Sequence, residues 1–405
     1  MKRLLIAAAA LISGIFTLQP VSAQDSDWQD VLDEAKGQTV YFHAWGGEPR
    51  INAYIQWAAR EVENLYDVRV VHVKVSDTAS VVSQVLAEKS VGKTSGGGVD
   101  LVWINGENFA AMKTSGLLAE PGWAQSLPNW TYVDTENKPT VLVDFTVQTD
   151  GQESPWGMAK LVFMYDTARL DIPPASLDAL LAYAKSNPGR FSYPQPPNFY
   201  GTTFLKQALL NTIADKAVLS DPVVPNEFEV QTAPLFNFLD ELHPHLWRQG
   251  QAFPKNAAHM RQLLADSEID IAFSFNPGDA SGAIVNGELP PTVRTFVFDG
   301  GTVGNTHFVA IPFNSSAQEG AKVFANHLLS PMAQMRKQDP EIWGDPTVLN
   351  VADLPANEKA LFDTQDLGPA TLTPEELGST LPEPHPSWVT ALEQAWATRY
   401  GAGSQ

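Results

Sequence analysis

Residues 99–112 read VDLVWINGENFAAM, and this stretch shows how the chain is built. Residues 99–104 form a mostly apolar run, which is typical of a buried strand. Asn105 and Gly106 then predict a tight turn, because both residue types tolerate backbone conformations that other residues avoid. The apolar spacing of residues 109–113 predicts that a helix follows. The stretch therefore predicts a strand, a turn and a helix in direct succession.

The same unit occurs twice before this stretch. Residues 39–45 (TVYFHAW) and 68–75 (VRVVHVKV) are rich in β-branched and aromatic side chains, which favour strands. Residues 49–66 and 77–88 have helical spacing of apolar side chains. Strands that alternate with helices in this way predict an α/β fold with a parallel sheet and right-handed connections.

The rest of the chain continues with mixed elements and no internal repeat. A turn is predicted at residues 151–157 (GQESPWG), and Pro234 is expected to kink a helix. The predicted strands are 141–145, 160–165, 269–275, 292–298 and 306–312, and the predicted helices are 176–186, 202–214, 226–246, 257–266, 317–329 and 387–400.

The first residues have the pattern of a cleavable export signal. Lys2 and Arg3 precede an apolar run at residues 4–18, and Val21-Ser22-Ala23 offers the small residues of a cleavage site. The run is too short to span a membrane. No cysteine lies near the site, so a lipid anchor is excluded. The prediction is a signal peptide at residues 1–23 and an exported protein.

Composition limits the fold and the partners. A chain of 405 residues exceeds what one hydrophobic core usually supports, so two lobes are expected. The chain has no cysteine, so disulfide bonds do not stabilise it. The formal net charge of −20 argues against nucleic acid or an anionic membrane as a partner, because both require a basic surface.

The catalytic and metal motifs of common enzymes are missing or incomplete. Gly92-Lys93-Thr94 lacks the earlier glycine of a phosphate-binding loop, since Ala87 stands there. There is no G-x-S-x-G elbow and no H-E-x-x-H motif. His243 and His245 form an isolated H-x-H pair, which is more often a surface feature than a metal site. The sequence therefore predicts no enzyme, no cofactor and no metal, with a secreted α/β hydrolase as the alternative.

Several turns share a composition that suits ligand binding. In an open α/β sheet, ligands bind in the crevice beyond the carboxyl ends of the strands. Glycine there lets the backbone approach a ligand, asparagine offers a donor and an acceptor, and aromatic rings form walls. Each turn alone is better explained as a helix cap, and only their recurrence in both halves of the chain suggests a shared cleft. The candidate ligand-binding residues are Trp45, Gly46, Gly47, Asn105, Glu107, Asn108, Trp156, Tyr200, Thr202, Asn276, Asp279 and Asn305.

Four segments carry a resemblance to a known family. They are VDLVWINGENFAAM (99–112), SPWGMAKLVFMYD (154–166), FSYPQPPNFYGTTFLKQALL (191–210) and GNTHFVAIPFNSSAQEGAKVFANHLLSP (304–331). With the export signal, they resemble the periplasmic solute-binding proteins of ABC importers, and in particular the YnjB-type branch. The resemblance implies a type II periplasmic-binding-protein fold, with two α/β lobes hinged by two crossing strands. It also implies a monomer that hands a small solute to an inner-membrane permease with a cytoplasmic ATPase.

The resemblance gives a division of the chain. Residues 24–150 form the first part of lobe 1, residues 151–301 form lobe 2, and residues 302–405 return to lobe 1 with the C-terminal helices. The crossings are expected at residues 141–156 and 298–306. Gly300, Gly301 and Gly304 suit a hinge there.

The ligand stays open between three classes. Aromatic walls at Trp45, Trp156, Tyr200 and Phe275, with acids at Glu107, Asp279 and Asp299, favour an organic cation or amine. A sugar would use the same aromatic and polar groups. An anion would rely on Arg50 and Lys160 with helix N-termini. If the asparagines contact ligand, Asn105→Ala and Asn108→Ala weaken binding and leave folding intact.

Overall fold

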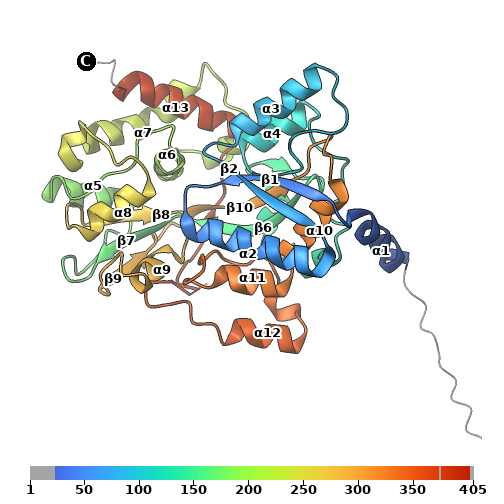
Figure 1. The fold of residues 1–405 in the computed structure, drawn as a ribbon. Coiled ribbons are helices and arrows are strands. Elements are labelled where there is room, and N and C mark those ends of the chain that lie inside the picture. Colours follow the sequence, from blue (N-terminus) through green and yellow to red (C-terminus); the bar gives the residue numbers. More distant parts are fainter. Residues whose placement is uncertain (1–22, 374, 402–405) are drawn as a thin grey trace, which may run out of the picture.

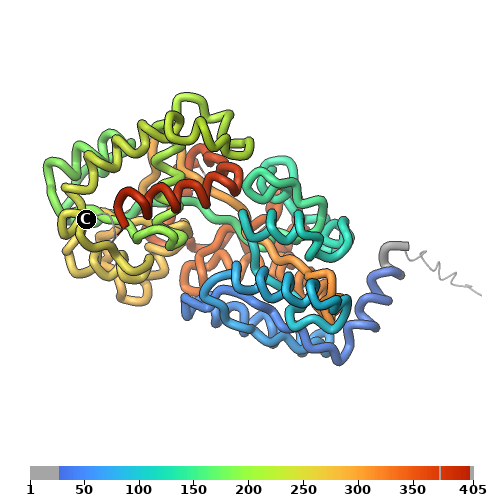
Figure 2. The backbone as a smooth tube through the Cα atoms, turned by 90° about the horizontal axis from the view of Figure 1, so that it is seen from above, coloured from blue at the N-terminus to red at the C-terminus, as the bar shows by residue number. Residues whose placement is uncertain are grey.

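The computed structural model describes residues 23–373 and 375–401, which form two lobes side by side (Figures 1 and 2). The predicted signal peptide, apart from Ala23, lies outside these residues. Within the described residues, no helix has the length and apolar character needed to cross a membrane.

One mixed sheet forms the centre of the first lobe. Its strand order is β11-β10-β3-β1-β2, and β6 pairs with β10 outside this path. β1 pairs with β2 and β3 in parallel, which confirms the parallel arrangement predicted for the first third of the chain. β10 runs antiparallel to β3 and β6. The strands are β1 Thr39–Trp45, β2 Arg69–Val75, β3 Leu101–Ile104, β6 Glu153–Lys160, β10 Thr302–Ala310 and β11 Thr380–Leu381.

Helices cover both faces of this sheet. Phe42 and Val40 pack with Tyr54 of α2 and Phe324 of α10 in one cluster, whereas Val102 packs with Val85 of α3 in another. The predicted helix at residues 49–66 is confirmed as α2, which begins with a proline and ends at the left-handed residue Asp67. The helices of this lobe are α1 Ala23–Ala35, α2 Pro49–Tyr66, α3 Ala79–Ser90, α4 Glu107–Thr114, α10 Gln318–Leu328, α11 Pro331–Gln338 and α12 Ala356–Asp363.

The second lobe has its own sheet and its own core. Its sheet is antiparallel in the order β8-β7-β9, and Phe163 stacks on Phe298 with the ring centres 4.5 Å apart. Its strands and helices are β7 Val162–Asp166, β8 Ile271–Ser274, β9 Val293–Phe296, α5 Leu177–Ser186, α6 Phe199–Thr212, α7 Phe228–Leu242, α8 Ala257–Ala265 and α9 Asp279–Val285. Pro234 lies inside α7.

Short elements complete the chain. A small hairpin, β4 Val143–Asp144 and β5 Val147–Gln148, replaces the longer strand predicted at residues 141–145. The 3-10 helices are Pro128–Tyr132, Pro139–Val141, Lys216–Ser220, His243–His245, Trp247–Gly250 and Val351–Asp353.

The last helix, α13 Pro386–Tyr400, packs on α6 and lies over the second lobe in Figure 2. Its apolar side chains Trp388, Leu392 and Trp396 belong to the core that also contains Phe204 of α6. The sequence placed all of residues 302–405 with the first lobe, whereas these side chains share the core of the second. The lobe boundaries themselves stay a prediction.

The turn predicted at residues 151–157 is wrong, because most of it is strand β6. Ser154 and Pro155 pair with Val309 and Phe308 of β10, and the register shifts beside this proline. A proline cannot donate to the ladder and is tolerated where the pairing is irregular. The chain passes from the first sheet into β7 at Leu161 and returns into β10 at Thr302, inside the second crossing predicted at residues 298–306.

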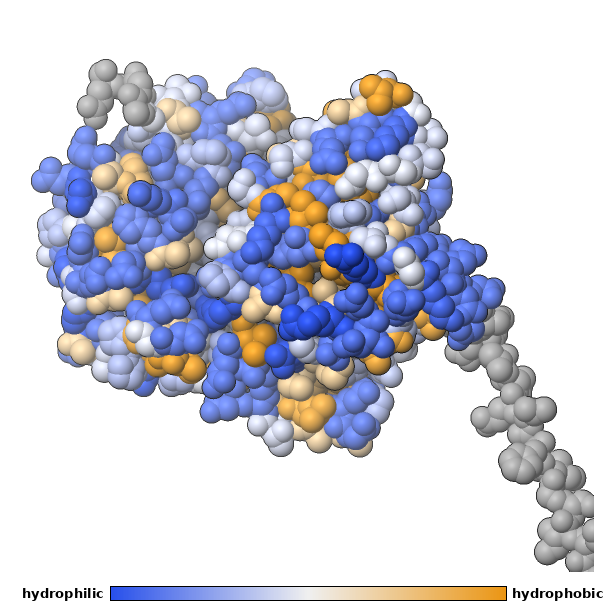
Figure 3. All heavy atoms as spheres, in the orientation of Figure 1, coloured by the Kyte–Doolittle hydropathy of each residue, from blue (hydrophilic) through white to orange (hydrophobic). Residues whose placement is uncertain are grey.

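The surface is mostly polar, with apolar atoms gathered over β1 and β2 on the face shown in Figure 3. β2 is the edge strand of its sheet, and most of its side chains are only partly buried.

Candidate functional site

The turn before α4 places Glu107 at the boundary between the lobes. Gly106 has φ 61° and ψ −129°, and a Cβ atom there would lie 2.8 Å from the ring of Phe145. Its N–H donates to Asp144 Oδ2 at 2.7 Å. Glycine is therefore required both by the backbone and by the close approach. The turn fixes Glu107 as the first residue of the helix.

Glu107 is exposed, but its surroundings are crowded. Desolvation by the surrounding protein raises the pKa of its carboxyl, and the nearby carboxylates of Glu393 and Glu383 raise it further, while Lys206 lowers it. Lys206 and Glu393 lie on α6 and α13, whose side chains share the core of the second lobe. Glu107 therefore lies within electrostatic reach of charged groups of the other lobe.

Lys206 is almost fully buried, and its charge is already paired. Its Nζ atom lies 2.6 Å from Glu383 Oε2, and 4.8 Å and 5.6 Å from the ring centres of Phe145 and Phe199. Asn305 of β10 donates to the other oxygen of Glu383 at 3.0 Å. A pocket of about 200 Å³ opens beside this pair and is lined partly by Phe145, Asn305 and Glu383. Lys206 is therefore part of the wall of the pocket, and its charge is neutralised by Glu383.

Glu393 of α13 is held by a side chain of its own lobe. Thr202 of α6 donates to Glu393 Oε1 at 2.6 Å. Burial raises the pKa of Glu393. The hydrogen bond from Thr202 and the charge of Lys206 lower it, and the charge of Asp77, just before α3, raises it. The carboxyls of Glu107 and Glu393 therefore both hold a proton more readily than a free glutamate does, and they come from different lobes.

The turn after β1 presents an aromatic ring. Trp45 is 39% exposed, and a Cβ atom on Gly47 would lie 2.3 Å from its indole. Gly46 donates to Val75 O at 3.1 Å and accepts from Asn52 Nδ2 at 3.0 Å. The glycines let the turn fold closely over the indole and leave its outer face to solvent.

The turn before α9 is occupied by contacts with the first lobe. Asp279 accepts from Arg50 at 2.8 Å and from Arg261 at 3.0 Å. Asn276 donates to Trp343 O at 2.9 Å. Both of these predicted ligand residues therefore already have partners. Tyr200 lies nearby, and burial raises the pKa of its hydroxyl to about 12.

The structure brings part of the predicted set together. Glu107, Thr202 and Asn305 gather around Lys206 and Glu383, with Asn108 donating to Glu107 at 3.3 Å. Trp156 lies apart from this group, because it is completely buried between Phe42, Tyr54 and Trp103, and offers no surface to a ligand in this conformation. Phe275 is also buried, and Lys160 is bound by the carbonyls of Gly378 and Ser379.

Sequence reasoning missed four charged groups at the lobe boundary: Lys206, Arg261, Glu383 and Glu393. A signal existed for Lys206, because a lysine inside the apolar helical segment FLKQALL must be buried with a partner. The two glutamates come from the acidic C-terminal region, where nothing distinguishes them from surface acids.

Comparison with known proteins identifies the class. Residues 57–361 match the family model of the bacterial extracellular solute-binding proteins. The chain is also 45% identical over 391 residues to protein YnjB of Escherichia coli K12, covering 96% of this chain and 97% of that one. The chain belongs to the extracellular solute-binding family of ABC-type transporters. These similarities give no support to a hydrolase.

Solved structures share the fold at low sequence identity. Periplasmic binding protein AfuA of Actinobacillus pleuropneumoniae has a TM-score of 0.60 at 16% identity, over 90% of this chain and 99% of that one. The spermidine/putrescine-binding protein PotD of Streptococcus pneumoniae has a TM-score of 0.59 at 16% identity, over 90% and 98%. Iron-bound HitA of Pseudomonas aeruginosa has a TM-score of 0.56 at 18% identity, over 88% and 99%. The fold is the type II periplasmic-binding-protein fold, as expected.

Proposed function

We propose that this protein is the periplasmic component of an ABC import system. It captures a small solute between its two lobes and delivers it to an inner-membrane permease. The family supports solute binding, the residues 1–23 support export, and the two separate cores joined by few connections support closure around a solute.

We further propose that the solute is an organic cation or an amine. The observation that carries this proposal is that two carboxylates from the two lobes, Glu107 and Glu393, both have a raised pKa and both interact with the charge of Lys206. A ligand ammonium group placed there gains charge-assisted hydrogen bonds in a partly desolvated site. The exposed rings of Trp45 and Phe199 offer flat faces to a cation.

The charges at the lobe boundary disfavour an anion. Arg50 and Arg261 share Asp279 and also pair with Glu48 and Glu288, and Lys206 is bound by Glu383, so these cations are already neutralised. The fold does not decide the matter, because the similar structures are described as binding fructose-6-phosphate, spermidine or putrescine, and iron.

The test is a binding panel of amines, neutral sugars and organic anions, measured by thermal shift and calorimetry. An amine that binds should raise the melting temperature, since a ligand at 100 times its Kd adds about 2.7 kcal/mol. Glu107→Gln should weaken that binding by at least about tenfold, which is the loss of about 1.4 kcal/mol.

Glu120→Gln is the matched control, because Glu120 is an exposed acid of the same region. Binding of a sugar or an anion, or an amine affinity that survives Glu107→Gln, would refute the ligand class. Native mass spectrometry of protein isolated from its own periplasm would then identify the retained solute.

A further inference from the structure

A buried carboxyl binds the turn that places Glu107. Asp144 belongs to the short strand β4, and the residue is 1% exposed. Its Oδ2 atom accepts the N–H of Gly106 at 2.7 Å, and Glu107 is the next residue along the chain. A single hydrogen bond therefore connects the buried acid to the backbone from which Glu107 begins α4.

The same hairpin touches the turn a second time. The residue after Asp144 is Phe145, and a Cβ atom on Gly106 would lie 2.8 Å from its ring. The Nζ atom of Lys206 lies 4.8 Å from the centre of that ring. Two consecutive residues of the hairpin thus fix the turn, one through a hydrogen bond and one through its ring, so a change at Asp144 is transmitted directly to Glu107.

The carboxyl of Asp144 has no cation to balance a negative charge. Among the residues that the structure describes, no lysine, arginine or histidine lies within ion-pair distance of it, and its Oδ1 atom has no hydrogen-bond partner. Lys206 acts on it electrostatically but is bound to Glu383 at 2.6 Å. A carboxylate in such a place loses its hydration and gains little in return, so the neutral, protonated form is favoured.

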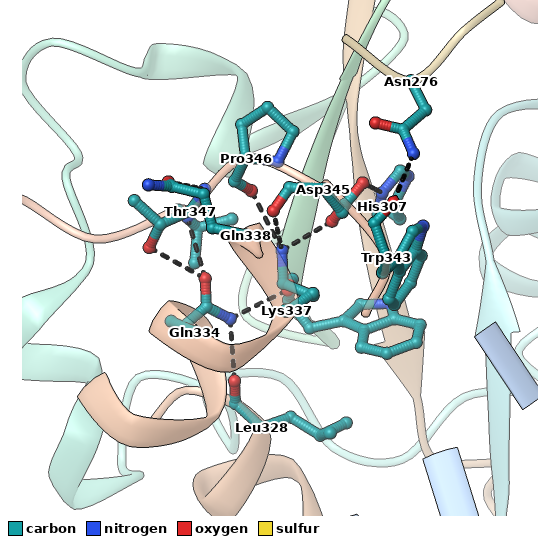
Figure 4. A network of polar contacts seen from close by, with 12 residues as sticks. Asn276, His307, Leu328, Gln334, Lys337, Gln338, Trp343, Asp345, Pro346 and Thr347 are labelled. Atoms are coloured by element: carbon teal, nitrogen blue, oxygen red, sulfur yellow. Dashed lines mark hydrogen bonds and ion pairs between the residues drawn. The ribbon is translucent and has the colours of Figure 1, made fainter. Parts of the chain in front are cut away.

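Asp345 is the opposite case in the same lobe (Figure 4). It is also 1% exposed, but Lys337 lies 2.5 Å from its Oδ2 atom and His307 lies 2.7 Å from its Oδ1 atom. Both oxygens therefore have a partner, and one partner is a lysine, which stabilises the carboxylate form. Two equally buried acids thus differ in their partners, and only Asp144 is left to hold a proton.

The charges around Asp144 act in the same sense. Burial is the main cause that raises the pKa of its carboxyl well above the ordinary value, and the hydrogen bond from the turn lowers the pKa in part. The charges of Glu107 and Glu383 raise the pKa further, and the charge of Lys206 lowers it. Asp144 also acts on Glu153 of β6, a second fully buried acid. The affinity of Asp144 for its proton therefore depends on the charge at Glu107.

We propose that Asp144 is a positioning residue of the solute site: it holds the turn that places Glu107, and it releases its proton when the positive charge of a solute binds beside Glu107. The inference rests on the proposed function, since it takes Glu107 as a group that binds the solute. A cation there cancels the charge of Glu107 and favours the carboxylate of Asp144, whose O–H bond breaks as the proton passes to solvent. The affinity for a cation therefore rises with pH for as long as Asp144 is protonated in the free protein.

The first test follows the proton and needs no solute. Infrared difference spectra over a pH series detect the carbonyl stretch of a protonated carboxyl, which lies apart from the amide bands. Asp144→Asn keeps an oxygen that accepts the N–H of Gly106 but cannot hold the proton, so the signal that this variant lacks belongs to Asp144. Glu107→Gln removes a negative charge and should move the loss of that signal to lower pH. Glu107→Lys places an ammonium group at the solute position and should move it further.

The second test measures how firmly the turn is held. Asp144→Val removes the acceptor of the Gly106 N–H as well as the proton. Hydrogen exchange at residues 104–110 should therefore be faster in Asp144→Val than in the wild type. It should stay unchanged in Asp144→Asn, measured at a pH at which the wild-type carboxyl is protonated.

Glu120→Gln and Glu153→Gln are the controls. Glu120 is exposed, so its replacement should leave the Asp144 signal at the same pH. Neither oxygen of Glu153 has a partner among the described residues, so it gives a signal of its own, and Glu153→Gln separates the two acids. The proposal is overturned if no signal depends on Asp144, or if its pH dependence is the same in both Glu107 variants as in the wild type. These spectra involve no solute, so an amine panel without binding would refute the ligand class and not this result.

Discussion

At the scale of single residues, His327 gives the protein a sensitivity to acid. Its side chain lies in the core of the first lobe beside Trp57, and its Nε2 atom has no hydrogen-bond partner among the residues that the structure describes. Burial lowers the pKa of His327 to about 4. The folded state therefore holds this histidine neutral, whereas the unfolded chain binds a proton near its ordinary pKa of 6.5.

The sign of the effect follows from this difference. The stabilisation is complete above pH 6.5 and is lost as the pH falls towards 4, because the unfolded state then binds more protons. Between pH 7 and pH 4.5, the unfolding free energy of the wild type should therefore fall by about 2 kcal/mol more than that of His327→Leu. Denaturant titrations at the two pH values measure this.

The comparison of slopes is needed because other groups act in the opposite direction. Burial raises the pKa of Asp144 and Glu153, so protonation of these carboxyls stabilises the folded state at low pH. Asp144 and Glu153 are present in both the wild type and the variant, so their contributions cancel in the difference between the two pH slopes. Equal pH slopes for the two proteins would contradict a neutral buried His327.

Individual residues of the site could be predicted only where a local pattern marks them. Gly106 and Glu107 are marked by the end of a strand and the start of a helix. Glu383 meets Lys206 across 177 positions of the sequence, and no local pattern carries such a pairing. The predicted site therefore consisted of turn residues, and it lacked the four charged side chains Lys206, Arg261, Glu383 and Glu393.

At the scale of elements, α1, α11 and α12 were not predicted, but most other helices, the first three strands and β7 to β10 could be, because their apolar spacing is regular. β6 could not, because Ser-Pro-Trp-Gly has the composition of a turn. The pairing of this strand with β10 comes from residues about 150 positions away in the sequence. Tertiary pairing outweighed local preference there.

Trp156 of β6 can be tested for its role, which is either to stabilise the core or to bind solute. The indole is completely buried, and its ring contacts include Tyr54 and Trp343. Trp156→Ala should lower the unfolding free energy by about 3–5 kcal/mol through the cavity that it leaves. Solute affinity of the folded variant, measured by calorimetry well below its melting temperature, should change less than twofold. A large loss of affinity with normal stability would instead restore Trp156 as a wall of the ligand site.

At the scale of the whole molecule, length and element order were enough to predict an α/β protein of two lobes. They did not predict where the C-terminal helix packs, because the order of elements does not say which core an amphipathic helix completes. In the structure, β11 still pairs with β10, and the chain then continues into α13 on the second lobe.

The position of α13 predicts that the two lobes respond separately to mutation. Trp396 is completely buried in the second core, where its indole N–H donates to Tyr193 at 2.9 Å. Trp396→Ala should therefore cost about 3–5 kcal/mol in that lobe. Hydrogen exchange followed by mass spectrometry should show faster exchange in α6, α7 and β8, with little change in β1 and α2.

Phe324→Ala is the matched variant, because Phe324 is equally buried in the first core. It should give the opposite pattern, with faster exchange in β1 and α2. The two cores are separate clusters of side chains, so local unfolding of one does not require unfolding of the other. If Trp396→Ala loosens both lobes equally, the two lobes unfold as one cooperative unit.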